Sequence, residues 1–195
     1  MHFIPPGAFS PDMDTKMYSR SPQSVEFEAF WRSLRGERLI PDRGDFKPRN
    51  ASRFLSNIVL LEAPGDGRDS LRIRVAGQVL QDDVPYRLAG TDVLDCFPEE
   101  YRRGAIETGR LMIRKPCGLW QITPVHSGGY PHALEVTAFP LSAVSDGVPL
   151  IIMHLLPLDA PLPMASAPHA AAVDTALEFR FLDVGTGEPE WPLAA

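Results

Sequence analysis

The sequence predicts an α+β fold in which an amphipathic helix precedes five strands, the last three of which form an antiparallel meander. Two observations indicate this class. Segments in which apolar and polar residues alternate, as in strands, occur both before and after a long helical segment. The last three of these segments are joined by short glycine-containing turns, which are typical of antiparallel neighbours. The expected order after the first helix is two strands, a helical region and three strands.

Length and composition indicate one domain with extended ends. The chain has 195 residues, 44% apolar and 23% charged, which is typical of a single globular domain. Its 20 prolines are about twice the usual share of ~5%, and many lie near the two ends. We therefore expect an N-terminal arm over 1–20, a domain over 21–158, and a Pro/Ala-rich linker and tail over 159–195.

Charge and apolar runs exclude several classes of function. A net charge of −6 argues against binding to nucleic acid or to an anionic membrane surface. The sequence contains no run of about 18 apolar residues that could span a membrane, and it begins without the basic segment of a secretory signal. A cytoplasmic protein is expected. With two cysteines and no Cys-x-x-Cys pair, neither a disulfide framework nor a metal site is expected.

Residues 21–35 are predicted to form the first helix. Ser21 suits the N-cap, Pro22 suits the first helical position, and Gly36 suits the end. One face repeats apolar side chains at the helical spacing, namely Phe27, Phe30, Trp31 and Leu34. A face of this kind packs either on the domain core or on a second subunit. In the second case these four residues are candidates for a homodimer interface.

Two short strands and a long helix are expected next. The apolar run 58–61 predicts a buried strand, and the alternation over 71–75 predicts a half-exposed one. A helix follows over 98–115. Gly109 in its middle costs about 1 kcal/mol relative to Ala, which indicates a close packing contact at that point.

The C-terminal half is predicted to be mainly strand. The segments 119–125, 133–141 and 149–158 form a meander, and the third is apolar on both faces, as in a central strand. Residues 177–184 fit either a strand or a helix, and their alternation favours an extra strand. The two phenylalanines of this segment need burial on this domain or on a partner.

A loop after the first helix carries a more specific pattern. Residues 41–48 read Pro-Asp-Arg-Gly-Asp-Phe-Lys-Pro, and we expect an ion pair between Arg43 and Asp45 to hold the loop. Together with the tryptophan-containing helix before it, this Pro-x-Arg-x-Asp-apolar-x-Pro loop resembles the opening of a PAS-like family abundant in alphaproteobacteria. The matching positions are Pro41, Arg43, Asp45 and Pro48. The segments 74–77 and 88–97 resemble later parts of the same family, so the resemblance covers residues 25–158.

The resemblance implies a PAS-like fold, a five-stranded antiparallel sheet with helices on one face. It also implies a regulatory sensor or interaction module that binds a small ligand or an unknown protein partner, without catalysis, and that often forms homodimers. The resemblance does not identify a cofactor, but a flavin that forms a cysteine adduct and a haem ligated from the long helix are not expected. Cys96 stands six residues after Gly90 instead of the three of flavin photoreceptor motifs, and 98–115 contains no histidine to ligate a haem.

A ligand pocket is expected between the long helix and the sheet. Periodicity selects Tyr101, Met112, Trp120, Ile122, Met153 and His154 as its candidate lining. His154 is either a core histidine or a pocket group that changes its protonation. In the pocket it would support an alternative function, a small isomerase-like or hydratase-like cavity enzyme. A further alternative is a ligand-free adaptor whose phenylalanine-bearing tail docks on a partner.

Overall fold

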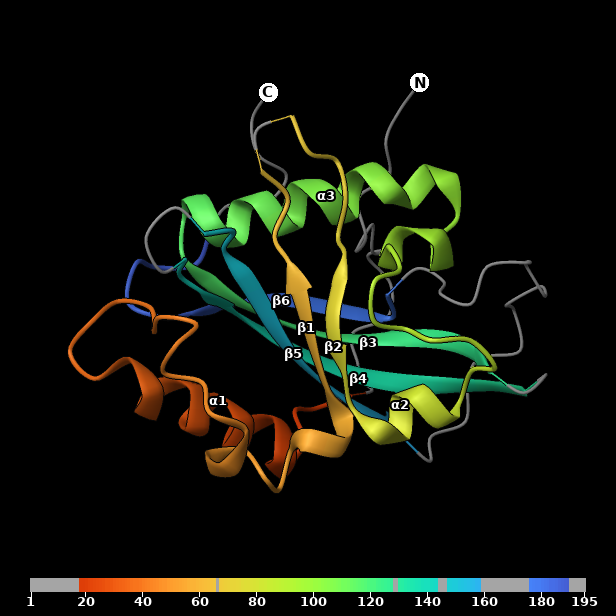
Figure 1. Ribbon diagram of the computed structural model, residues 1–195, viewed down its shortest axis with the longest axis horizontal. Coiled ribbons are helices and arrows are strands. Elements are labelled where there is room, and N and C mark those ends of the chain that lie inside the picture. Colours follow the sequence, from red (N-terminus) through yellow and green to blue (C-terminus); the bar gives the residue numbers. More distant parts are fainter. Residues whose placement is uncertain (1–17, 66, 128–129, 144–146, 159–175, 190–195) are drawn as a thin grey trace.

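The computed structural model consists of a twisted sheet between two helical layers (Figure 1). It describes residues 18–65, 67–127, 130–143, 147–158 and 176–189. Most of the predicted N-terminal arm and all of the predicted linker and tail except residues 176–189 lie outside these residues. Among the helices that the structure describes, none is both long enough and apolar enough to cross a membrane.

The sheet is antiparallel and has six strands in the order β2-β1-β5-β4-β3-β6. They are β1 (Ile58–Glu62), β2 (Ile73–Ala76), β3 (Cys117–Ser127), β4 (Tyr130–Leu141), β5 (Leu150–Leu158) and β6 (Glu178–Asp183). The five predicted strands are confirmed, and so is the strand interpretation of the tail. The sheet has one strand more than the expected five because β6 pairs with β3, placing Phe181 opposite Leu119.

Helices cover both faces of the sheet, not one. The three α-helices are α1 (Pro22–Arg35), α2 (Gln78–Asp82) and α3 (Glu99–Arg114), and short 3₁₀ turns lie at Pro48–Asn50, Leu55–Asn57 and Val93–Cys96. Figure 1 shows α3 on one side of the sheet and α1 on the opposite side. Successive residues of β5 explain this arrangement, because they point to opposite faces of the sheet. Ile151 packs in the α3 layer and Ile152 packs in the α1 layer. A sheet with two apolar faces needs a cover on each.

The apolar stripe of α1 belongs to the core of the chain itself. The Ser21 side chain accepts a hydrogen bond from the Ser24 N–H and so caps the helix. Phe27 and Trp31 are fully buried against the sheet, while Phe30 and Leu34 are half-buried. The interface assignment is therefore wrong for Phe27 and Trp31, because side chains without exposed surface cannot contact a second subunit. Amphipathic spacing reveals an apolar face but not what covers it.

The Pro41–Pro48 loop is held differently from the expectation. Asp45 pairs with Arg38 at 2.5 Å and accepts a hydrogen bond from the Asp42 N–H at 2.8 Å. Arg43 contributes its backbone N–H, which donates to the Ser142 carbonyl oxygen. The predicted Arg43–Asp45 pair is thus replaced by an Arg38–Asp45 pair. The loop is anchored to the residue that follows β4, and Pro48 begins the first 3₁₀ turn.

Gly109 and Gly77 are two of the positions at which neighbouring groups approach the backbone closely. A Cβ at Gly109 would lie 2.9 Å from Cδ of Pro64, which confirms the predicted close contact in the middle of α3. A Cβ at Gly77 would collide with the backbone carbonyl oxygens of Leu55 and Ser56. Both positions therefore need a residue without a side chain for steric reasons.

Candidate functional site: a cavity beneath helix α3

A cavity of about 130 Å³ lies between α3 and the face of the sheet that α3 covers. The long helix contributes Tyr101, Thr108 and Met112, and the central strand β5 contributes Met153. The 3₁₀ turn that precedes α3 adds Val93. Since these elements are far apart in the sequence, the cavity exists only in the folded chain.

Helical and strand periodicities direct these side chains into the cavity. On α3, Tyr101, Thr108 and Met112 are spaced by seven and four residues, which places them on one helical face. On β3 the lining residues are Leu119, Gln121 and Thr123, which alternate because successive strand residues point to opposite faces. The lining is therefore set by secondary structure, and only its assembly requires the tertiary fold.

The structure places three of the six predicted pocket residues in the lining and three elsewhere. Tyr101, Met112 and Met153 line the cavity. Trp120, Ile122 and His154 lie on the opposite face of the sheet. The error on β3 is one residue of register, which moves a whole set of side chains to the other face. On β5, Met153 and His154 are adjacent and therefore point to opposite faces, so only one of them could line the cavity. The correct β3 set, Leu119, Gln121 and Thr123, contains two polar residues, so hydrophobicity alone pointed to the wrong face.

His154 is a core histidine. Its ring stacks on Phe27 with 5.3 Å between centroids and meets Phe54 edge-on at 5.5 Å. Burial is the main influence and lowers the pKa of His154, while the charge of Glu135 acts in the opposite direction. The cavity enzyme considered from the sequence needed this histidine in the pocket, and the structure places it beneath α1.

The polar part of the lining lies on β3. Gln121 Nε2 donates a hydrogen bond to Thr123 Oγ1 at 2.8 Å. Thr123 is buried, and Thr108 presents a second buried hydroxyl-bearing side chain from α3. Of the described residues that form the lining, none carries a charge at neutral pH. The cavity therefore offers apolar contact together with a few neutral hydrogen-bonding groups.

The tail completes the cavity. Phe179 of β6 and the preceding Ala176 are part of the lining. Phe179 meets Phe181 edge-on, with 5.0 Å between ring centroids, and Phe181 is buried in the same core. The sequence left open whether these phenylalanines cover this domain or a partner, and the structure shows that they cover this domain. The alternation of residues 177–184 already indicated that both rings share a face.

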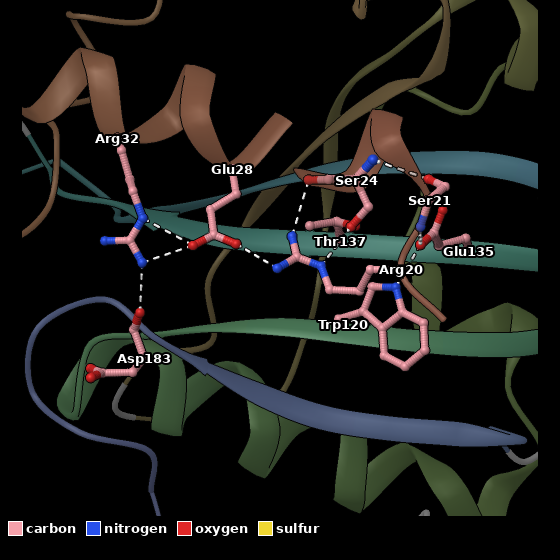
Figure 2. A network of polar contacts seen from close by, with 9 residues as sticks. All are labelled: Arg20, Ser21, Ser24, Glu28, Arg32, Trp120, Glu135, Thr137 and Asp183. Atoms are coloured by element: carbon pink, nitrogen blue, oxygen red, sulfur yellow. Dashed lines mark hydrogen bonds and ion pairs between the residues drawn. The ribbon is translucent and has the colours of Figure 1, made fainter. Parts of the chain in front are cut away.

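On the opposite face, a polar network joins α1 to the sheet (Figure 2). The buried carboxylate of Glu135 accepts hydrogen bonds through Oε1 from Trp120 Nε1 at 2.6 Å and from the Ser21 N–H at 2.9 Å. Ser24 Oγ and Thr137 Oγ1 form a further hydrogen bond of 2.7 Å. These contacts fix the first turn of α1 over β3 and β4.

The same network reaches β6 through Glu28 (Figure 2). Glu28 pairs with Arg20 at 2.6 Å and with Arg32 at 2.8 Å. Arg32 also donates to the Asp183 carbonyl oxygen at 2.7 Å. Burial by itself raises the pKa of Glu28, but the hydrogen bonds and charges of the two arginines outweigh it and lower that pKa from its ordinary value. The ion pairs of Glu28 thus lie on the α1 side of the sheet, away from the cavity.

Comparison with known families assigns this architecture. A family model described as a PAS domain matches residues 19–152. The chain belongs to the PAS domain family. The match extends from just before α1 into β5, so β6 lies outside the matched part of this PAS domain. The comparison with curated proteins finds no match.

Proposed function

We propose that this PAS domain is a regulatory sensor whose input is a small molecule held in the cavity between α3 and the sheet. The observation that carries the proposal is the cavity itself, with its apolar lining and few hydrogen-bonding groups. An apolar pocket with a small number of polar side chains is the usual form of a small-molecule site. Residues from α3, β3, β5 and β6 meet there, so an occupant would contact every layer of this side of the fold.

The chemistry of the lining favours binding over catalysis. Tyr101 is the only titratable residue among the described residues that line the cavity. The described lining residues include no histidine, carboxylate, lysine or cysteine, which are common general acids and bases. We therefore propose that the cavity binds its guest without making or breaking covalent bonds.

The output is proposed to pass through a protein partner, including a second copy of this chain. Arg32 of α1, which pairs with Glu28, donates a hydrogen bond to the Asp183 carbonyl oxygen at the end of β6, and β6 also carries Phe179 into the cavity. A change at the cavity can therefore reach α1 through one strand. A homodimer would use surfaces other than Phe27 and Trp31, which lie in the core.

Native mass spectrometry of the purified full-length chain tests the proposal. We expect a non-covalently retained small molecule in the wild type. The variant Ala105→Leu should lose it, because Ala105 lines the cavity and the larger side chain fills the space. The matched control is Ala29→Leu, the same change at an exposed position of α1. Equal retention by Ala105→Leu and by the wild type would contradict this site.

A further inference from the structure

We infer that the ligand of this cavity is a neutral molecule about the size of one aromatic ring, with a hydrogen-bonding group such as a hydroxyl. This inference rests on the proposed function, since it names the chemical class that the same cavity would accept. Three properties of the lining carry it: the volume, the absence of charge among the described lining residues, and the position of the polar side chains.

Volume limits the size of the ligand. The cavity measures about 130 Å³, and an apolar protein cavity of roughly 150 Å³ holds one benzene molecule. Drug-sized ligands occupy pockets of roughly 300–1,000 Å³. A flavin or a haem, each with several fused or linked rings, therefore does not fit wholly inside it. Met112 and Met153, whose side chains are flexible, can adjust the shape around a single ring.

Charge limits the chemical type. A buried ion needs an opposite charge or several hydrogen bonds to replace its lost hydration. The ion pairs of Glu28 with Arg20 and Arg32 belong to the α1 side of the sheet. Met112, Leu119 and Ile151, by contrast, surround the cavity with hydrocarbon and thioether groups. A carboxylate or an ammonium group would therefore be excluded, whereas the neutral form of a similar ring would be accepted.

Gln121 supplies the hydrogen-bonding end. One N–H of its amide is used by Thr123, and a glutamine amide has a second N–H and a carbonyl oxygen. The remaining capacity can serve a hydroxyl group on the ring. Phenol therefore combines the size, neutrality and polarity that the lining favours, and toluene is a matched probe without the hydroxyl.

Thermal unfolding of the full chain with four probes tests this inference. Phenol at about ten times its dissociation constant should raise the unfolding midpoint by about 3–6 °C. Benzoate at pH 7 and 2-naphthol, which test charge and size, should leave it unchanged. Ala105→Leu should abolish the phenol shift and Ala29→Leu should retain it. Gln121→Leu should fold with the cavity volume preserved and lower the preference for phenol over toluene by about 2- to 10-fold.

Failure of the inference and failure of the proposed function are distinguishable. If benzoate or 2-naphthol stabilises the wild type as strongly as phenol and Ala105→Leu removes the effect, the cavity binds ligands and the inferred class is wrong. A charged or multi-ring compound recovered by mass spectrometry leads to the same conclusion. If no probe shifts the midpoint and no compound is retained, both the inferred class and the proposed function are wrong.

Discussion

Trp31 lies flat on Phe139, with 4.8 Å between ring centroids and 19° between ring planes. Trp31 Nε1 also donates a hydrogen bond to the Pro140 carbonyl oxygen at 2.9 Å. The Trp31 ring therefore buries its apolar surface against β4, and its N–H group finds a hydrogen-bond acceptor on the same strand. This pair explains why the first helix is part of the domain core.

Replacing Trp31 should destabilise the whole fold. Trp31→Ala removes a fully buried side chain, so we expect a loss of about 3–5 kcal/mol in the free energy of unfolding. The measurement is urea unfolding followed by circular dichroism. Val25→Ala on the same helix is the control, because Val25 is 52% exposed and surface changes usually stay within about 0.5 kcal/mol. Equal effects of the two variants would show that α1 does not pack on the sheet.

Gly109 and Pro64 should be energetically coupled. Gly109→Ala improves helix propensity by about 1 kcal/mol, but its Cβ would lie 2.9 Å from the Pro64 ring. We expect the substitution to destabilise the wild type and to be clearly less unfavourable in a Pro64→Ala background. A double-mutant cycle measures the coupling, expected at about 0.5–3 kcal/mol. Additive effects would mean that α3 does not approach Pro64 closely.

The two phenylalanines of β6 should have different roles. Phe179 lines the cavity, whereas Phe181 packs in the adjoining core. We expect Phe179→Ala to enlarge the cavity so that 2-naphthol now raises the unfolding midpoint. Phe181→Ala should lower the midpoint without admitting this probe. If both variants respond to 2-naphthol alike, Phe179 does not limit the size of the ligand.

Glu28 should make the free energy of unfolding depend on pH in the acidic range. Its pKa is lower in the folded chain than its ordinary value of 4.5. The carboxylate form therefore stabilises the folded state above that ordinary value, and this contribution is lost as the pH falls through the lower folded pKa. Glu28→Gln should reduce stability at pH 7 and lose less on acidification than the wild type.

Urea unfolding at pH 7 and at pH 3 measures this difference. Glu26→Gln is the control, since Glu26 is an exposed residue of the same helix that pairs with Arg53. An exposed ion pair contributes little to stability, so Glu26→Gln should follow the wild-type pH dependence. If Glu28→Gln also shows the wild-type pH dependence, the ion pairs of Glu28 with Arg20 and Arg32 do not stabilise the folded state.

The two thiols should be protected in the native state. Burial raises the pKa of Cys117 to about 12, so very little thiolate exists at pH 8. Burial also raises the pKa of Cys96, against a hydrogen bond from Tyr86 that lowers it. Iodoacetamide at pH 8 should leave Cys117 unmodified and label Cys96 more slowly than a free thiol. Full labelling in guanidinium is the control, and rapid native labelling of Cys117 would contradict its buried position.

Local patterns predicted most of the elements. The Ser21 cap, the helical spacing of Phe27 and Trp31, and the alternation of the last strands are properties of neighbouring residues, and each appears in the structure. Half of the candidate pocket was misplaced because the direction of a strand side chain depends on register. On β3, Gln121 lines the cavity instead of Trp120 because the prediction was one residue out of register. On β5, the adjacent residues Met153 and His154 point to opposite faces, so only Met153 lines the cavity.

The loop interactions show the same limit at short range. Arg43 and Asp45 are near neighbours in the sequence, yet the carboxylate pairs with Arg38 and the Arg43 backbone bonds to Ser142. Spacing alone could not choose between two nearby arginines. The choice follows from the way in which the end of β4 orients this loop, and that orientation is a long-range contact.

The amino-acid sequence by itself determined the kinds of element, their order and the membership suggested by the Pro41–Pro48 loop, because these depend on local periodicity, caps and turns. The tertiary structure alone decided that α1 covers the second sheet face, that β6 joins β3, and that Gln121 and Phe179 meet Met112 around one cavity. Those outcomes depend on strand register and on the competition between distant apolar surfaces for burial, which neighbouring residues do not encode.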